Sequence, residues 1–139
     1  MSVIALDPGN STGWVFREAD GSISGGTCGE NHTHVWKLLE SYHPETIVYE
    51  TFQMYPGKAQ KLVWNTFYPC EVIGVIKLYA MLHPEVSLVG LQPSVKKFSL
   101  GNNELDLWKT VNTYGQSATE HMRDAVRLLR YYERNYKGK

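Results

Sequence analysis

The sequence predicts an α/β fold in which a five-stranded sheet is flanked by helices. Short runs rich in apolar and β-branched residues alternate with longer segments of helical periodicity. Their order along the chain is three strands, a helix, a strand, a helix, a strand and then further helices, which favours one sheet covered by helices. The first strand has four apolar residues in succession before it reaches an acid, as expected for a strand that is buried on both faces.

The bounds of each element follow from these patterns. The expected strands cover residues 2–7, 12–17, 22–28, 46–50 and 86–91. The expected helices cover residues 33–42, 66–82, 94–98 and 104–114, and a last helix begins at the capping box of Ser117 and ends near Tyr136. Pro69 falls in the first turn of helix 66–82, where a missing amide is tolerated. The inward stripe expected on that helix comprises Val72, Val75, Ile76, Tyr79 and Leu82.

Length and composition fit one globular domain. The chain has 139 residues, 42% of them apolar and 20% charged, and we expect residues 1–139 to form a single domain with its own core. No apolar run approaches the length of a membrane span, and the N-terminal residues lack the pattern of a secretory signal. Cys28 and Cys70 have no metal-type spacing, so free thiols in a reducing compartment are expected.

Acids stand at the ends of two predicted strands. Asp7 follows the apolar run of the first strand and precedes Pro8-Gly9, which ends that strand. Glu50 ends the strand 46–50 in the same way. Each acid alone also fits a simple turn or strand end. Together they mark equivalent ends of two strands, which is the edge of an open α/β sheet where sites are usually built.

A histidine and a third acid lie near the start of the last predicted helix. His121 and Asp124 are three residues apart and therefore share one face of that helix. Apolar residues continue this face, namely Ala125, Leu128, Leu129 and Tyr132. A pair that only complements the helix dipole is the simpler alternative. With Asp7 and Glu50, the set offers three carboxylates and one imidazole, which suit Mg²⁺ or Mn²⁺ better than structural zinc.

These motifs, in this order, resemble the RuvC-type Holliday-junction resolvases of the ribonuclease H-like superfamily. The resemblance rests on Asp-Pro-Gly and Thr-Gly between Asp7 and Gly13, on the strand-end Glu50, on Pro93-Ser94-Val95-Lys96-Lys97, and on His-x-x-Asp-Ala from His121. It spans nearly the whole chain, from Val3 to about Tyr132. It implies a ribonuclease H-like fold with a mixed five-stranded sheet.

The resemblance implies a hydrolase that resolves four-way DNA junctions by paired nicks, working as a homodimer in the cytoplasm of a bacterial cell or a phage-infected host. In that family the matching positions bind two divalent ions, Mg²⁺ or Mn²⁺, which carries over to Asp7, Glu50, His121 and Asp124 as metal ligands and catalytic residues. Asp7 is the candidate bridging ligand, Glu50 is expected to bind one ion, and His121 with Asp124 the other. A general base is the alternative role for His121.

The charge distribution indicates where DNA would bind. Net charge is zero, but residues 1–49 carry two basic and six acidic side chains, whereas residues 50–139 carry twelve basic and eight acidic ones. A phosphate-binding surface is therefore expected from the second part. The expected contacts are two aromatic residues that follow Glu50 and four lysines, namely Phe52, Tyr55, Lys58, Lys61, Lys96 and Lys97. In the family a base-stacking Phe lies three residues after the Glu, where this chain has Gln53, and burial in the core is the alternative for Phe52.

Other functions remain open at this stage. A ribonuclease H acting on RNA–DNA hybrids would share the fold, but usually has an all-carboxylate site, whereas His121 favours the resolvase branch. An actin- or sugar-kinase-like phosphotransferase would need two such domains, for which 139 residues are too few. A non-catalytic protein that binds branched DNA would not need the four site residues, whereas this chain has all four of them. The helix 66–82 offers more apolar surface than one buried face needs, which favours it as the homodimer interface.

Overall fold

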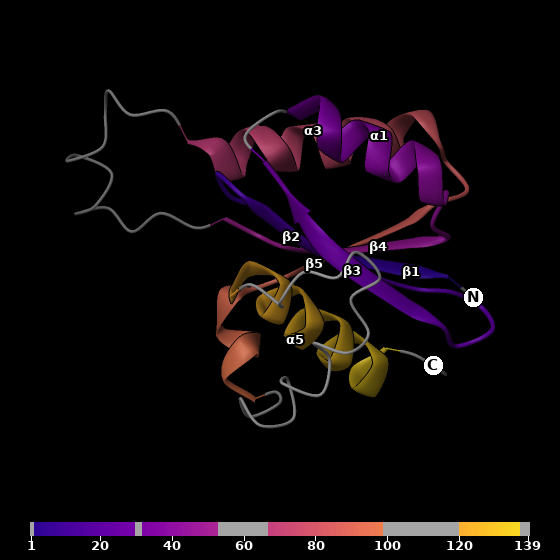
Figure 1. Cartoon of the computed structure of the whole chain (residues 1–139), viewed down its shortest axis with the longest axis vertical. Helices are drawn as coiled ribbons and strands as arrows, with labels where there is room; N and C mark the ends of the chain where they lie inside the picture. The colour runs from indigo at the N-terminus through magenta and orange to yellow at the C-terminus, as the bar shows by residue number, and fades with distance from the viewer. Residues whose placement is uncertain (1, 30–31, 53–66, 99–119, 137–139) are drawn as a thin grey trace.

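The computed structural model describes residues 2–29, 32–52, 67–98 and 120–136, and the elements within these ranges form three layers (Figure 1). The strands are β1 (Val3–Asp7), β2 (Thr12–Arg17), β3 (Ile23–Cys28), β4 (Thr46–Glu50) and β5 (Ser87–Leu91). The α-helices are α1 (His32–Tyr42), α3 (Tyr68–Leu82) and α5 (Glu120–Asn135). A 3₁₀ helix, η1, covers Pro93–Phe98.

One mixed sheet forms the middle layer, with the strand order β3-β2-β1-β4-β5. The first three strands form an antiparallel meander, and β1 pairs in parallel with β4, which pairs in parallel with β5. The predicted mixed five-stranded sheet is therefore confirmed. Because β1, β4 and β5 run in the same direction, their carboxyl ends meet at one edge of the sheet.

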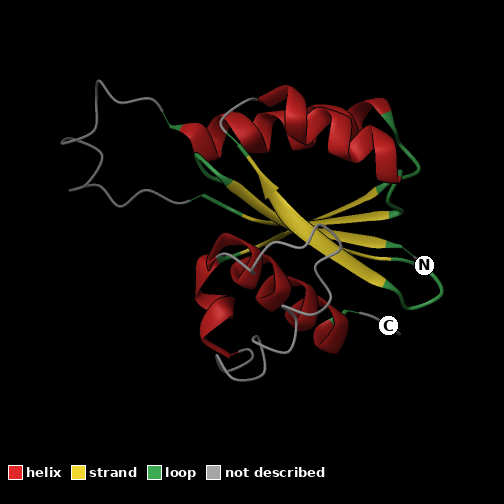
Figure 2. Cartoon of the chain, in the orientation of Figure 1, coloured by secondary structure: helices red, strands yellow, loops and turns green. Residues whose placement is uncertain are grey.

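Helices cover both faces of the sheet (Figure 2). The alternation of side chains along β1 explains this: Ile4 and Leu6 pack under α1 and α3, whereas Val3 and Ala5 pack against α5. All four side chains are buried, as predicted for a strand covered on both sides. The two cores lie on opposite faces of the same strands and hold the sheet rigidly between them.

The helices α1, α3 and α5 lie where the sequence predicts them, with bounds that differ by at most three residues. Pro69 lies in the first turn of α3, as predicted, and the segment predicted as a short helix at 94–98 is the 3₁₀ helix η1. The expected helix 104–114 and the capping residue Ser117 lie outside the described residues. In the ranges that the structure describes, no helix is long and apolar enough to cross a membrane. Cys28 and Cys70 are free cysteines, as predicted.

One prediction about α3 is wrong. Leu82 was expected in the inward stripe, but 60% of it is exposed. The buried line on α3 runs through Val72, Ile76 and Tyr79. A helix turns about 100° per residue, which places Leu82 about 120° from Ile76 around the axis, on the flank of the helix rather than on its inner face.

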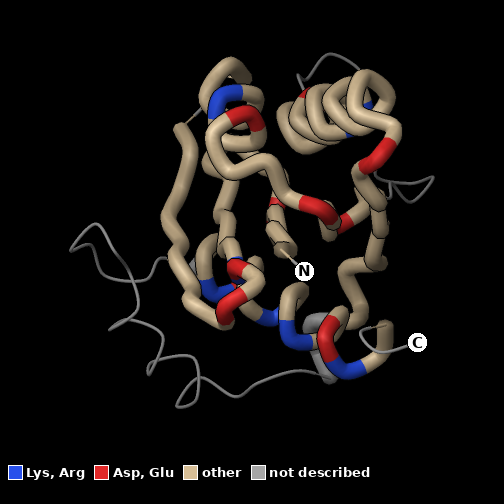
Figure 3. The backbone as a smooth tube through the Cα atoms, turned by 90° about the vertical axis from the view of Figure 1, so that its right-hand side faces the viewer, with Lys and Arg blue, Asp and Glu red and all other residues tan. Residues whose placement is uncertain are grey.

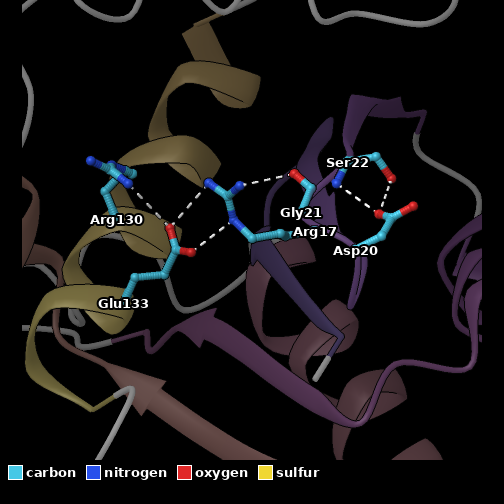
Figure 4. Close-up of polar contacts among 6 residues, drawn as sticks. All are labelled: Arg17, Asp20, Gly21, Ser22, Arg130 and Glu133. Carbon is cyan, nitrogen blue, oxygen red and sulfur yellow. Dashed lines mark hydrogen bonds and ion pairs between the residues drawn. The ribbon is translucent and has the colours of Figure 1, made fainter.

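A group of charged side chains ties the far end of α5 to the sheet (Figure 4). Arg17 at the end of β2 contacts Glu133 of α5, with 2.7 Å between Nε and Oε2, and donates from Nη1 to the carbonyl oxygen of Gly21 at 3.2 Å. Arg130 approaches the same carboxylate at 3.5 Å. The Arg17 and Glu133 side chains are only 19% and 11% exposed, so this pair helps to fix the angle at which α5 crosses the sheet.

Candidate active site

Asp7 and Glu50 lie side by side at the carboxyl edge of the sheet. The register pairs Leu6 with Tyr49, so the next residues of β1 and β4 are Asp7 and Glu50. Asp7 follows the alternation of Val3 and Ala5, and Glu50 follows that of Val48; both side chains therefore point to the face that α5 covers. Asp7 is buried, and one carboxylate oxygen of Glu50 is shielded from solvent.

Gly13 brings the start of α5 against this edge. It is the residue of β2 that pairs directly with Asp7. A side chain at Gly13 would overlap the carbonyl group of His121, the second residue of α5, so only glycine allows the helix to approach this closely. The Thr-Gly of the sequence motif thus sets the distance between the helix and the first acid.

His121 is the helix residue that reaches Asp7. Its Nδ1 atom lies 3.6 Å from Oδ2 of Asp7, with 49% of the His121 side chain exposed and only 11% of the Asp7 side chain. The histidine therefore lies at the mouth of the site and the acid at its floor. This arrangement agrees with either role expected for His121, since an exposed ring nitrogen can hold a metal ion or exchange a proton with solvent.

Asp124 lies one turn further along α5 and is held by an arginine. Oδ1 of Asp124 accepts a hydrogen bond from Nη1 of Arg127 at 2.8 Å, and both side chains are 19% exposed. Ala125, Leu128 and Leu129 are fully buried, which confirms the predicted apolar face of α5.

The donor set fits a hard divalent cation. Two carboxylates on neighbouring strands that point to the same face repel each other unless a cation neutralises them. Oxygen-rich sets with one imidazole suit Mg²⁺ or Mn²⁺. Among the described residues, however, no three His, Cys, Asp or Glu side chains lie close enough together to hold a metal ion. The backbone brings Asp7, Glu50 and the start of α5 to one edge, where His121 approaches Asp7 to 3.6 Å.

The expected DNA contacts are only partly described. Phe52 is 38% exposed, and its ring centre lies 6.0 Å from that of Phe67, so the ring is at the surface rather than in the core. Tyr55, Lys58 and Lys61 lie outside the described residues, as do the side chains of Lys96 and Lys97 on η1. Arginines recur along α5, the helix that carries the site, at Arg123, Arg127, Arg130 and Arg134. Figure 3 shows basic and acidic residues along the part of the chain that leads to the C-terminus.

Two residues of the site were not singled out as site residues by the sequence. Gly13 was noted as part of a motif, but its contact with His121 depends on how α5 crosses β2. Arg127 is one of four arginines in the last predicted helix, and its i, i+3 spacing from Asp124 was the available signal for their contact.

Comparisons with known proteins agree on the fold. No protein-family model matches the sequence, and no curated protein matches it either. Among solved structures, the chain is similar to Thermus thermophilus RuvC in complex with a Holliday junction substrate, with a TM-score of 0.61 and 19% identity over 99% of this chain and 98% of that one. It is similar to the fowlpox virus Holliday junction resolvase, with a TM-score of 0.63 and 11% identity over 96% of this chain and 98% of that one.

A third similar structure is the yeast mitochondrial Holliday junction resolvase, Ydc2, with a TM-score of 0.53 and 17% identity over 95% of this chain and 78% of that one. These identities are low, and the likeness lies in the path of the chain. The protein therefore has the ribonuclease H-like fold, in the form found in RuvC-type Holliday-junction resolvases, as the sequence predicted.

Proposed function

We propose that the protein is a metal-dependent endodeoxyribonuclease that resolves four-way DNA junctions by paired nicks. The observation that carries the proposal is the placement of Asp7 and Glu50 on neighbouring strands at one edge of the sheet, with His121 3.6 Å from Asp7, in a fold shared with three junction resolvases. We further propose that residues 1–139 act as one domain, in the cytoplasm.

The residues that would hold divalent ions are Asp7, Glu50, Asp124 and His121. When bound, Mg²⁺ or Mn²⁺ supplies the activation of a water and the neutralisation of charge on the phosphate; two ions per site are proposed. Asp7 ends β1, the central strand of the sheet, and its side chain is buried. Glu50 adds a second carboxylate on the neighbouring strand. His121 either adds a ligand or holds the proton that leaves the water.

DNA binding is proposed for the surface around this edge. Lys58, Lys61, Lys96 and Lys97 would contact phosphates, and Phe52 and Tyr55 would stack on unpaired bases. Replacement of the four lysines by Gln should weaken junction binding and reduce the slope of log K against log salt by roughly one unit for each lost phosphate contact. Filter binding at several salt concentrations measures that slope, and an unchanged slope would show that the lysines are ordinary surface residues.

A homodimer is proposed through the exposed side of α3. Leu78, Met81 and Leu82 are 50%, 78% and 60% exposed, although they are large apolar residues on one helix. Gly74 is exposed on the same helix, with no atom within 4 Å of where a Cβ would lie, so a second helix can approach there. A second copy of the chain would bury this surface and supply the second site that paired nicking needs.

Sedimentation tests this interface. The wild-type protein should sediment as a dimer, and Leu78→Glu combined with Met81→Glu should convert it to a monomer. Lys37→Glu changes the charge of an exposed residue of α1 and should leave the dimer intact. A monomeric wild-type protein, or a dimer that survives both substitutions in α3, would contradict the proposed interface.

The substrate is tested with three labelled nucleic acids: a four-way junction, a linear duplex of the same sequence and an RNA–DNA hybrid. With Mg²⁺, only the junction should be cut, and chelation of the metal should stop the reaction. Cleavage of the hybrid in preference to the junction would indicate a ribonuclease H instead. Binding of the junction without cleavage in either Mg²⁺ or Mn²⁺ would indicate a non-catalytic DNA-binding protein.

A further inference from the structure

Arg127 and Asp124 form a short ion pair between two residues of α5. The guanidinium Nη1 lies 2.8 Å from Oδ1 of Asp124, and each side chain is 19% exposed. A second pair with the same spacing, Arg130 and Glu133, is separated by 3.5 Å, and Arg130 is 34% exposed. The pair at the candidate site is thus the shorter of the two and contains the more buried arginine.

Burial strengthens the interaction between Arg127 and Asp124. Charges that are largely removed from water interact more strongly than surface charges, and an arginine that is four-fifths buried is already confined to few rotamers. The guanidinium of Arg127 therefore restrains the carboxylate of Asp124.

We propose that Arg127 is a positioning residue for the metal site, an inference that rests on the function proposed above. By donating to Oδ1 at 2.8 Å, Arg127 holds the carboxylate of Asp124 in one orientation relative to α5. Groups that hydrogen-bond to a ligating carboxylate typically affect metal affinity or activity by about 10- to 100-fold when they are removed.

Three variants test this role. Arg127→Gln removes the charge and the fork of donors, Arg127→Lys keeps the charge without the fork, and Arg130→Gln is a matched control on the same helix, with the same spacing to its acid. The readouts are Mn²⁺ affinity by calorimetry, junction affinity in EDTA at several salt concentrations, junction cleavage and thermal denaturation.

We expect Arg127→Gln to weaken Mn²⁺ binding by about 10- to 100-fold. Arg127→Lys should weaken it less, and Arg130→Gln should match the wild type. Junction affinity in EDTA should be unchanged in all three, because the role acts through Asp124 and not on DNA. If Arg127→Gln fails to fold, the Lys variant alone decides the question through its Mn²⁺ affinity.

Several results would overturn the inference. Unchanged Mn²⁺ affinity in the Arg127 variants would show that the contact does not position Asp124. Tighter Mn²⁺ binding would show that Arg127 competes with the metal. Unchanged Mn²⁺ affinity with a lower salt slope for junction binding would make Arg127 a phosphate contact. A wild-type protein that neither binds Mn²⁺ nor cuts the junction would refute the proposed function itself.

Discussion

A methyl group added at Gly13 would strike the start of α5. In the Gly13→Ala variant, the new Cβ would overlap the carbonyl group of His121 and lie 2.6 Å from the backbone nitrogen of Met122, whereas ordinary contacts begin at 3.4 Å. Both obstacles are backbone atoms, so no side-chain rotation can relieve the overlap. The first turn of α5 must move away from β2, and His121 and Asp124 move with it.

The expected effects on stability and on activity differ in size. Relief of the Met122 contact alone needs a shift of close to 1 Å. Overpacking of this kind costs about 1–3 kcal/mol of folding free energy. Misplacement of catalytic groups by about 1 Å costs roughly 100-fold in rate. Gly13→Ala should therefore remain folded under mild conditions and lose most of its cleavage activity.

The assay compares urea denaturation and junction cleavage per folded molecule in Gly13→Ala, Gly29→Ala and the wild type. Gly29 lies just after β3 and is exposed, with no atom within 4 Å of where a Cβ would be, so its variant should behave as the wild type does. Wild-type stability together with wild-type cleavage in Gly13→Ala would refute the claim that this glycine sets the approach of α5 to Asp7.

Two further predictions concern other buried groups. Burial raises the pKa of the Cys28 thiol from 9.0 to about 11, so the thiol of the unfolded chain ionises at lower pH than that of the folded protein. The wild type should therefore lose stability relative to Cys28→Ala as pH rises through 9 towards 11. Identical pH profiles of denaturation for the two proteins would contradict this. Glu133→Gln should cost about 1.5–3 kcal/mol by weakening the contact with Arg17, whereas Glu18→Gln in the exposed turn should cost little; equal urea midpoints for the two variants would contradict it.

The sheet could be predicted because its signals are local. The four apolar residues that precede Asp7 indicate a strand buried on both faces, whatever packs against it. The register of β1 with β4 then brings Asp7 beside Glu50 without any further information. The same local reasoning located His121 and Asp124 on one face at the start of α5.

The features that could not be predicted depend on how elements meet. The overlap that excludes a side chain at Gly13 exists only because α5 crosses β2 at that residue. Helical periodicity did not reveal that Leu82 lies on the flank of α3. The apolar residues of this helix cover a wider arc of its surface than the strip around Ile76 and Tyr79 that is buried against the rest of the protein. The sequence offers more than one i, i+3 pair of opposite charge along α5, and both Asp124–Arg127 and Arg130–Glu133 form. Only the structure shows that the pair with the more buried arginine is the one that contains Asp124.

The proposed mechanism depends most directly on the carboxylate of Asp7. Asp7→Asn keeps the shape of the side chain and removes the charge that would hold a divalent ion. The measurement is cleavage of a four-way junction in Mg²⁺ by the wild type and by Asp7→Asn, with junction binding measured for both in the same buffer. We predict paired nicks by the wild type and no product from Asp7→Asn, with binding retained. Full cleavage by Asp7→Asn would contradict the proposed mechanism.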